Sequence, residues 1–134
     1  MLPRRLALLG ALVAALAVPA LAGAVALPGI LTGPAPSGAN GTVLFQRLQA
    51  LHLPALTAEG TVVHIHQHLD LYIGPSHVPV PAGIGIDQLD RFISPIHTHT
   101  YDGVIHVESP TVRKFTLGEF FGVWGLRFTP TCIG

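Results

Sequence analysis

The alternation of residue types along residues 62–73 constrains the fold more than any other feature of this chain. The odd positions of this stretch are nearly all apolar. The even positions include His64, His66, His68 and Asp70. Because successive side chains of a strand point to opposite faces, this pattern predicts one strand with a core face and a histidine face.

A second histidine-bearing unit is predicted over residues 96–108. Asp102-Gly103 lies between two runs of β-favouring residues, which is typical of a two-residue hairpin turn. A three-residue loop would change which residues are opposed. With the two-residue turn, two polar pairs lie on one face of the hairpin: His99 with His106, and His97 with Glu108.

Two short helices are predicted beside these strands. Apolar residues at helical spacing favour a helix over residues 42–51. In residues 115–125, Thr116 and Glu119 form a capping box, and Gly125 can end the helix in the left-handed conformation. Four aromatic residues near this helix are expected in the core: Phe120, Phe121, Trp124 and Phe128.

The stretch between the two strand units is less regular. Its prolines restrict residues 77–82 to an edge strand or a wall of the site, and residues 83–92 are predicted to form a loop with a helical turn. Together the elements predict an α+β fold. We expect a small, mainly antiparallel β-sheet or partial barrel with one or two short helices.

The N-terminal residues carry a targeting pattern. Two arginines precede residues 6–31, which contain no charged or amide side chain. This favours a signal peptide over residues 1–26. An uncleaved membrane anchor is the alternative, because the apolar stretch exceeds the roughly 20 residues that span a bilayer. Residues 27–41, rich in Gly and Pro, then form a tether, and residues 42–134 form an exported domain, extracellular or in the cell envelope.

Charge and cysteine content limit the classes of partner. Without residues 1–26 the chain keeps five Lys+Arg residues against seven Asp+Glu residues, a net charge of −2. A nucleic-acid surface would need a basic stripe, so this class of partner is not expected. Cys132 is the only cysteine, which leaves a free thiol, a disulfide between chains or a metal ligand as its roles.

The concentration of histidine predicts a metal site. A stable zinc or copper site needs three or four donors at about 2 Å from the ion, and strands with alternate histidines can supply them. Side chains four residues apart on a strand are about 13 Å apart, so either two ions bind or one ion binds beside spectator histidines. The candidate donors are His64, His66, His68, Asp70, His97, His99, His106 and Glu108.

The donor types also limit the metal. Imidazole and carboxylate donors, without a CxxC motif or a methionine other than Met1, favour Cu(II) or Zn(II) over Cu(I). His52, at a helix end, and His77, beside a turn, are expected to be incidental.

We therefore expect an exported protein that binds Cu(II) or Zn(II) for buffering, delivery or sensing. One alternative is a small extracytoplasmic metalloenzyme, in which three histidines hold the ion and Glu108 or Asp70 acts as base. Another is a non-metal interaction module that responds to pH because several histidines protonate together. No residue pattern identifies a protein partner, and residues 6–31 offer a membrane tether.

Three motifs resemble those of a known family. The segment PAGIGI (residues 81–86), the hairpin HTHTYDGVIHVESP (97–110) and the helix FTLGEFFGVWG (115–125) follow an HxH strand. This order is similar to that of an uncharacterised family of small exported bacterial proteins. The resemblance spans about residues 60–128 and implies export but no activity. An acidic residue often follows HTH in that family, whereas Thr100 stands at that position in this chain.

Overall fold

The computed structural model describes residues 41–89 and 91–133. The predicted signal peptide or anchor lies outside these residues, as does the predicted tether except for Gly41. Among the described helices, none has the length and the apolar character needed to cross a membrane.

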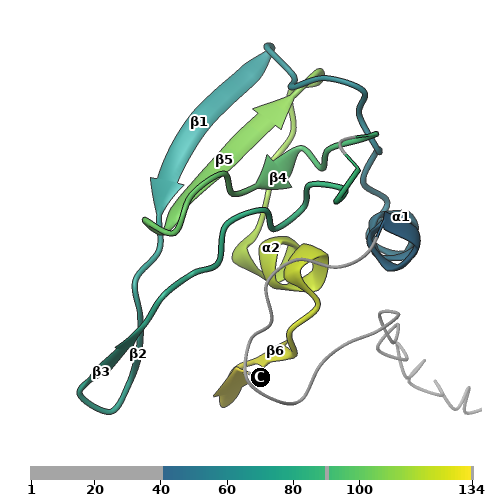
Figure 1. Cartoon of the computed structure of the whole chain (residues 1–134). Helices are drawn as coiled ribbons and strands as arrows, with labels where there is room; N and C mark the ends of the chain where they lie inside the picture. The colour runs from purple at the N-terminus through teal and green to yellow at the C-terminus, as the bar shows by residue number, and fades with distance from the viewer. Residues whose placement is uncertain (1–40, 90, 134) are drawn as a thin grey trace, which may run out of the picture.

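A three-stranded sheet and two helices form the body of the domain (Figure 1). The elements in chain order are α1 (Gly41–Ala50), β1 (Val63–His68), β2 (Leu71–Ile73), β3 (Ser76–Val78), β4 (Ile96–His97), β5 (Val104–Ser109), α2 (Leu117–Trp124), β6 (Phe128–Thr129) and β7 (Cys132–Ile133). In the main sheet β5 lies between β1 and β4, and both pairs are antiparallel. The structure thus confirms the α+β class with a small antiparallel sheet.

The strand predicted over residues 62–73 is divided into two strands. β1 ends at His68, and β2 begins at Leu71. The N–H of Leu69 donates to the carbonyl of Gly103 at 2.9 Å, and the chain then leaves the main sheet. β2 pairs with β3, and the two form a hairpin that projects from the body (Figure 1). The prediction of one strand was wrong because the alternation of residue types continues through both strands.

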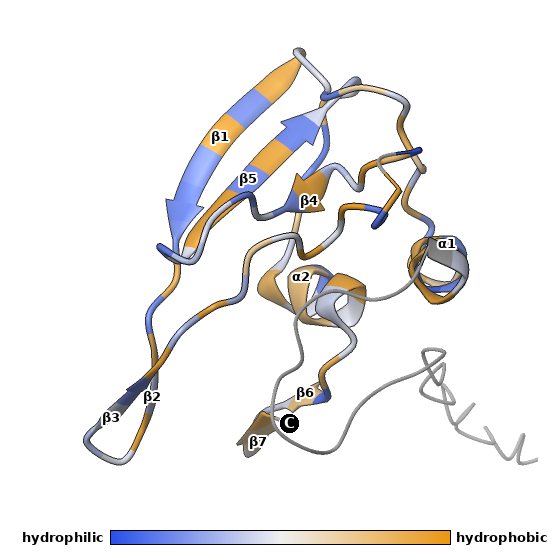
Figure 2. Ribbon diagram, viewed as in Figure 1, coloured by the Kyte–Doolittle hydropathy of each residue, from blue (hydrophilic) through white to orange (hydrophobic). Residues whose placement is uncertain are grey.

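The predicted core face of this strand is only partly present within β1, where Val63 is half-buried against the core. Figure 2 shows the alternation of polar and apolar residues along β1. Ile65 is nevertheless 47% exposed, although it shares a cross-strand row with the buried Val107 and Ile96. The reason is that β1 is an edge strand, whereas α2 packs against β4.

The hairpin between β4 and β5 has a longer loop than predicted. His97 pairs with His106 and Ile96 with Val107, so both predicted pairs, His97 with Glu108 and His99 with His106, are wrong. The chain leaves the ladder at Thr98, whose N–H donates to the carbonyl of Ile84 at 3.0 Å. A contact with a distant loop therefore sets the register, and the Asp-Gly turn signal does not.

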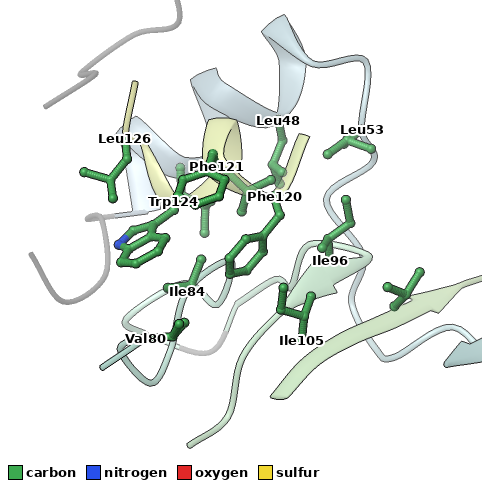
Figure 3. Packing of buried hydrophobic residues seen from close by; sticks show 13 residues of the cluster. Leu48, Leu53, Val80, Ile84, Ile96, Ile105, Phe120, Phe121, Trp124 and Leu126 are labelled. Carbon is green, nitrogen blue, oxygen red and sulfur yellow. The ribbon is translucent and has the colours of Figure 1, made fainter. Parts of the chain in front are cut away.

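Helix α2 begins and ends as predicted and supplies much of the core. Thr116 is the N-cap, the capping box with Glu119 is present, and Gly125 adopts the left-handed conformation with φ 85°. Phe120, Phe121 and Trp124 are buried as expected (Figure 3). Burial of each such side chain contributes about 1.5–3 kcal/mol. Phe128 departs from the prediction, since it stacks on Phe121 but stays 41% exposed.

A buried arginine joins the two helices. Arg47 of α1 donates to the carbonyl of Trp124 at 2.9 Å and to that of Val123 at 3.4 Å. These carbonyls end α2, where the helix dipole favours a cation. A Cβ at Gly125 would lie 2.1 Å from Cζ of Arg47, so glycine is needed there for space as well as for conformation.

The loop over residues 83–92 is held by an ion pair. The buried carboxylate of Asp87 accepts hydrogen bonds from Nε of Arg91 at 2.6 Å and from its Nη2 at 3.1 Å. The hydrogen bonds from Arg91 hold the pKa of Asp87 below its usual value. This pair closes the turn around residues 87–91, which the sequence predicted as a helical turn.

Candidate metal centre

Five polar side chains occupy two neighbouring rows across one face of the main sheet. His66, His106 and His97 form one row, because His106 pairs with both of the other two. His64 and Glu108 form the next row. Side chains opposed in this way have Cβ atoms about 5 Å apart, so the rows bring imidazoles from all three strands together.

Three histidines converge at the β4–β5 side of this face. One ligand atom each from His97, His99 and His106 lies within 4.8 Å of the others. The Nε2 atoms of His97 and His99 are 3.1 Å apart. Two donors bound to one tetrahedral ion at about 2 Å are roughly 3.3 Å apart, so this spacing suits a shared ion.

The hydrogen bond of Nδ1 determines which nitrogen of His97 has a lone pair for a ligand. Nδ1 of His97 lies 2.9 Å from the carbonyl oxygen of Ser94. A carbonyl only accepts, so Nδ1 carries the proton and Nε2 has a free lone pair. Burial lowers the pKa of His97 to about 4, against a smaller opposing effect of the bond to Ser94. His97 is therefore neutral at physiological pH, which is the form that binds metals.

A close approach of the loop buries His97. Gly85 has φ 77°, and a Cβ at this position would lie 2.6 Å from the carbonyl oxygen of Ile96 and 3.1 Å from Cβ of His97. The adjacent Thr98 is tied to the same region, since its hydroxyl donates to the carbonyl of Pro81 at 2.8 Å. His97 is 0% exposed as a result.

Glu108 carries a buried carboxylate into the middle of the cluster. Its Oε1 accepts a hydrogen bond from Nδ1 of His106 at 3.0 Å, whereas Oε2 has no hydrogen-bond partner among the described residues. The nearest imidazole nitrogen to Oε2 is Nε2 of His97 at 3.8 Å, which is too long for a hydrogen bond. A buried polar atom without a partner is costly, so Oε2 is a position where a cation would be stabilised.

The pKa of Glu108 agrees with this interpretation. Burial acts to raise it, but the hydrogen bond from His106 and the attraction of the nearby imidazoles outweigh burial. The pKa therefore lies below its usual value, and the carboxylate is ionised at neutral pH. With Nδ1 donating to this carboxylate, the Nε2 atom of His106 is left to bind an ion, an arrangement common in metal sites.

A second group of donors lies at the β1 side of the face. Nε2 of His64 is 3.4 Å from Oε1 of Glu108, and Nε2 of His66 is 3.6 Å from the same oxygen. Both imidazoles are 51% exposed. These three donors also lie within 4.8 Å of one another.

Glu59 is a candidate ligand that the sequence analysis missed. Its Oε1 lies 3.1 Å from Nε2 of His99, and it forms a possible three-donor group with His97 and Glu108. The loop that carries it is packed tightly, since a Cβ at Gly60 would lie 2.2 Å from the backbone of Ser109. Glu59 lies outside any strand, so no periodic pattern could have indicated it.

His68 and Asp70 lie apart from these groups. Nε2 of His68 donates to the carbonyl of Asp102 at 2.8 Å, and its Nδ1 lies 3.5 Å from Asp70. Asp70 also approaches Nε2 of His77 at 3.6 Å. Within the described chain, neither His68 nor Asp70 belongs to a group of three donors that could hold one ion. Of the eight predicted donors, the structure thus brings six together.

The remaining histidine and the cysteine lie in other elements. His52 follows α1 with φ 54°, a left-handed conformation typical of a residue that ends a helix. Cys132 lies in β7, and its Sγ contacts Nη2 of Arg127 at 3.0 Å. Neither residue is part of a donor group among the residues described.

A shallow cavity borders the histidine cluster. Its volume is about 360 Å³, and its wall combines polar and apolar side chains. His99 and Glu59 form the polar part, while Ile86, Phe92 and Ile93 line the rest. A small molecule in this cavity would therefore lie next to the imidazole of His99.

Comparison of the chain with family models, with curated proteins and with solved structures finds no match. The resemblance to a family of small exported proteins stays a prediction.

Proposed function

We propose that this protein binds one Zn(II) or Cu(II) ion through His97, His99 and His106, and that it buffers, delivers or senses this metal outside the cytoplasm. The observation that supports the proposal most strongly is the convergence of the three imidazoles within 4.8 Å. Neutral imidazole is a common metal ligand, so three imidazoles that converge in this way are well placed to bind one ion.

The hydrogen-bond geometry of the cluster supports the same conclusion. Nε2 of His97 is unprotonated, so the proton in its 3.1 Å contact with His99 is held by His99. Oε1 of Glu59 lies 3.1 Å from the same Nε2 of His99. Binding would replace the proton of His99 by an ion, and Glu59 would offer an oxygen donor beside the three imidazoles.

The burial of the site favours retention of the ion over rapid exchange. His97 is 0% exposed, and the side chain of His106 is 19% exposed. The side chain of His99 is 39% exposed, so an ion held there is partly shielded from water and from competing ligands. This property suits a protein that stores or carries a metal.

Metal analysis of the full chain tests this proposal. The protein, purified without a histidine tag in a mild detergent, is dialysed against a trace mixture of divalent metals and then analysed for bound metal. We expect at least one equivalent of zinc or copper. The double variant His97→Ala/His99→Ala is expected to lose this equivalent, whereas the control His52→Ala/His77→Ala keeps it. Equal metal content in the parent and the first variant would contradict the proposal.

The cavity favours a second candidate function, a small metalloenzyme. Glu59 and His99 line the cavity, so a substrate there would meet the ion, and Glu59 could act as a base toward a metal-bound water. Turnover of an activated ester by the zinc-loaded protein tests this candidate. Loss of turnover in Glu59→Gln with unchanged zinc content would support it, and a rate equal to that of free zinc would exclude it.

A further inference from the structure

The carboxylate of Glu108 faces two groups of donors with its two oxygens. Oε1 lies 3.4 Å from Nε2 of His64 and 3.6 Å from Nε2 of His66. Oε2 is directed toward the other group, 3.8 Å from Nε2 of His97. Oε1 also accepts the hydrogen bond from Nδ1 of His106, which leaves a second lone pair of Oε1 for the side of His64 and His66, while Oε2 is available to the side of His97.

One ion cannot use all of these donors. Among the described residues, His64 and His66 share no donor group with the three histidines of the β4–β5 side. The two groups are nevertheless adjacent, because the rings of His66 and His106 are 4.4 Å apart between centroids. Two neighbouring positions for an ion fit this arrangement, and a single position does not.

The burial of Glu108 gives an independent indication. The residue is 2% exposed and its Oε2 has no hydrogen-bond partner among the described residues. The hydrogen bond from His106 compensates Oε1, but a buried oxygen left without a partner, such as Oε2, is unfavourable. Cations on both sides would compensate the carboxylate, and carboxylate oxygens are good ligands for divalent ions.

We infer that the sheet binds a second divalent ion between His64 and His66, and that Glu108 bridges this ion to the one held by His97, His99 and His106. The inference rests on the proposed function and extends it to a two-metal centre. Water would complete the coordination of the second ion, since His64 and His66 are half exposed.

The two positions differ in how an ion can reach them. The first position is partly enclosed, because His97 is buried, whereas the second lies on the edge strand β1 and is open to solvent. The second ion is therefore expected to bind more weakly and to exchange faster. Such an ion is the one that a buffering or delivery protein takes up and releases.

Titration of the full chain with Zn(II), with a competing chelator to define the free concentration, tests the number of ions. We expect two equivalents, the second bound at least about tenfold more weakly than the first. His64→Ala/His66→Ala is expected to lose only the weaker equivalent. The matched control His68→Ala/His77→Ala, which removes two exposed histidines outside both donor groups, is expected to keep both equivalents.

Electron paramagnetic resonance of the protein loaded with Cu(II) tests the bridge. Two Cu(II) ions joined by a carboxylate couple magnetically, so the signal of isolated Cu(II) should account for much less than the copper present. Glu108→Gln should lose the weaker equivalent and show one uncoupled Cu(II) of full intensity. Far-ultraviolet circular dichroism checks that each variant is folded.

The possible outcomes separate this inference from the proposed function. One equivalent in the parent, unchanged in His64→Ala/His66→Ala, would overturn the second ion and leave the first site intact. Two equivalents that are uncoupled and insensitive to Glu108→Gln would overturn the bridge. No metal bound to the parent at all would overturn the proposed function together with the inference.

Discussion

The two sides of the histidine face carry the same side chains in different surroundings. On the β4–β5 side His97 and Glu108 are buried, and β4 packs on α2. On the β1 side His64 and His66 are half exposed on an edge strand. The residue types of the two sides do not reveal this difference, because it comes from what covers each strand.

This difference implies that folding alone orders the donors on the β4–β5 side, before any ion binds. Ordering a side chain at the moment of binding costs about 0.5–1.5 kcal/mol. The side chains on the β4–β5 side are already ordered by packing and by hydrogen bonds such as that of His97 to Ser94. The β1 side must order two solvated imidazoles. We therefore expect tight binding on the first side and weaker binding on the second.

The largest expected effect is on the affinity of the buried side. His97→Ala should weaken the tightest Zn(II) site by more than about 100-fold, because loss of even an outer-shell partner in metal sites costs 10–100-fold. Chelator competition measures the change. His64→Ala is the matched comparison on the exposed side and should change the tight affinity by less than about tenfold. Equal effects of the two variants would show that the sides do not differ.

The next effect is on thermal stability. Zn(II) at 100 times its dissociation constant should stabilise the fold by about 2.7 kcal/mol, which raises the melting temperature by roughly 10 °C. Differential scanning fluorimetry measures this shift. In Glu108→Gln the shift should be smaller. The metal-free variant should melt below the parent, because the lowered pKa of Glu108 means that its ionised form is more stable in the folded protein than in the unfolded chain. A metal-free variant that melts at or above the parent would contradict this explanation.

A smaller effect is expected on the free energy of unfolding, with zinc affinity unchanged. Thr116→Ala removes the N-cap of α2 and should reduce the free energy of unfolding by about 1 kcal/mol. Urea denaturation of the metal-free protein measures this loss. Zinc affinity should stay within about twofold of the parent, since the helix lies on the other side of the sheet from the histidines. A large loss of affinity would mean that site order depends on general stability, not on local contacts.

The smallest expected effect concerns the loop that covers His97. The pKa of Asp87 is lowered by Arg91, so this pair stabilises the folded state above the unfolded pKa of aspartate, near 4. The stabilisation is lost as the pH falls through the lower, folded pKa. Asp87→Asn should therefore be less stable than the parent at pH 6, and the difference should shrink toward pH 3 in urea denaturation. A difference independent of pH would contradict the role of this ion pair.

Local signals in the sequence predicted the ends of α2 correctly. The capping box of Thr116 and Glu119 and the left-handed Gly125 act within one turn of helix, so neighbouring residues determine them. The same holds for the donors on β1 and β5, because alternate residues share a face of a strand whatever their partner strand is. His99 follows β4 outside any strand, so alternation does not explain its place in the cluster.

Contacts between residues far apart in the sequence determine three features that no local pattern predicts. The register of β4 on β5 depends on the bonds of Thr98 to Ile84, which are remote in sequence. The exposure of Ile65 depends on which strand α2 covers. Glu59 reaches His99 from a loop, through packing of Gly60 on β5. None of these contacts has a periodic signature.

Anomalous diffraction from crystals of the full chain soaked in Zn(II), recorded on both sides of the zinc absorption edge, tests the central claim most directly. The expected result is a zinc peak about 2 Å from Nε2 of His97 and Nε2 of His99, with His106 as a third ligand. A peak only at exposed histidines such as His52 or His77, or no peak while these three imidazoles keep their hydrogen bonds, would contradict the claim.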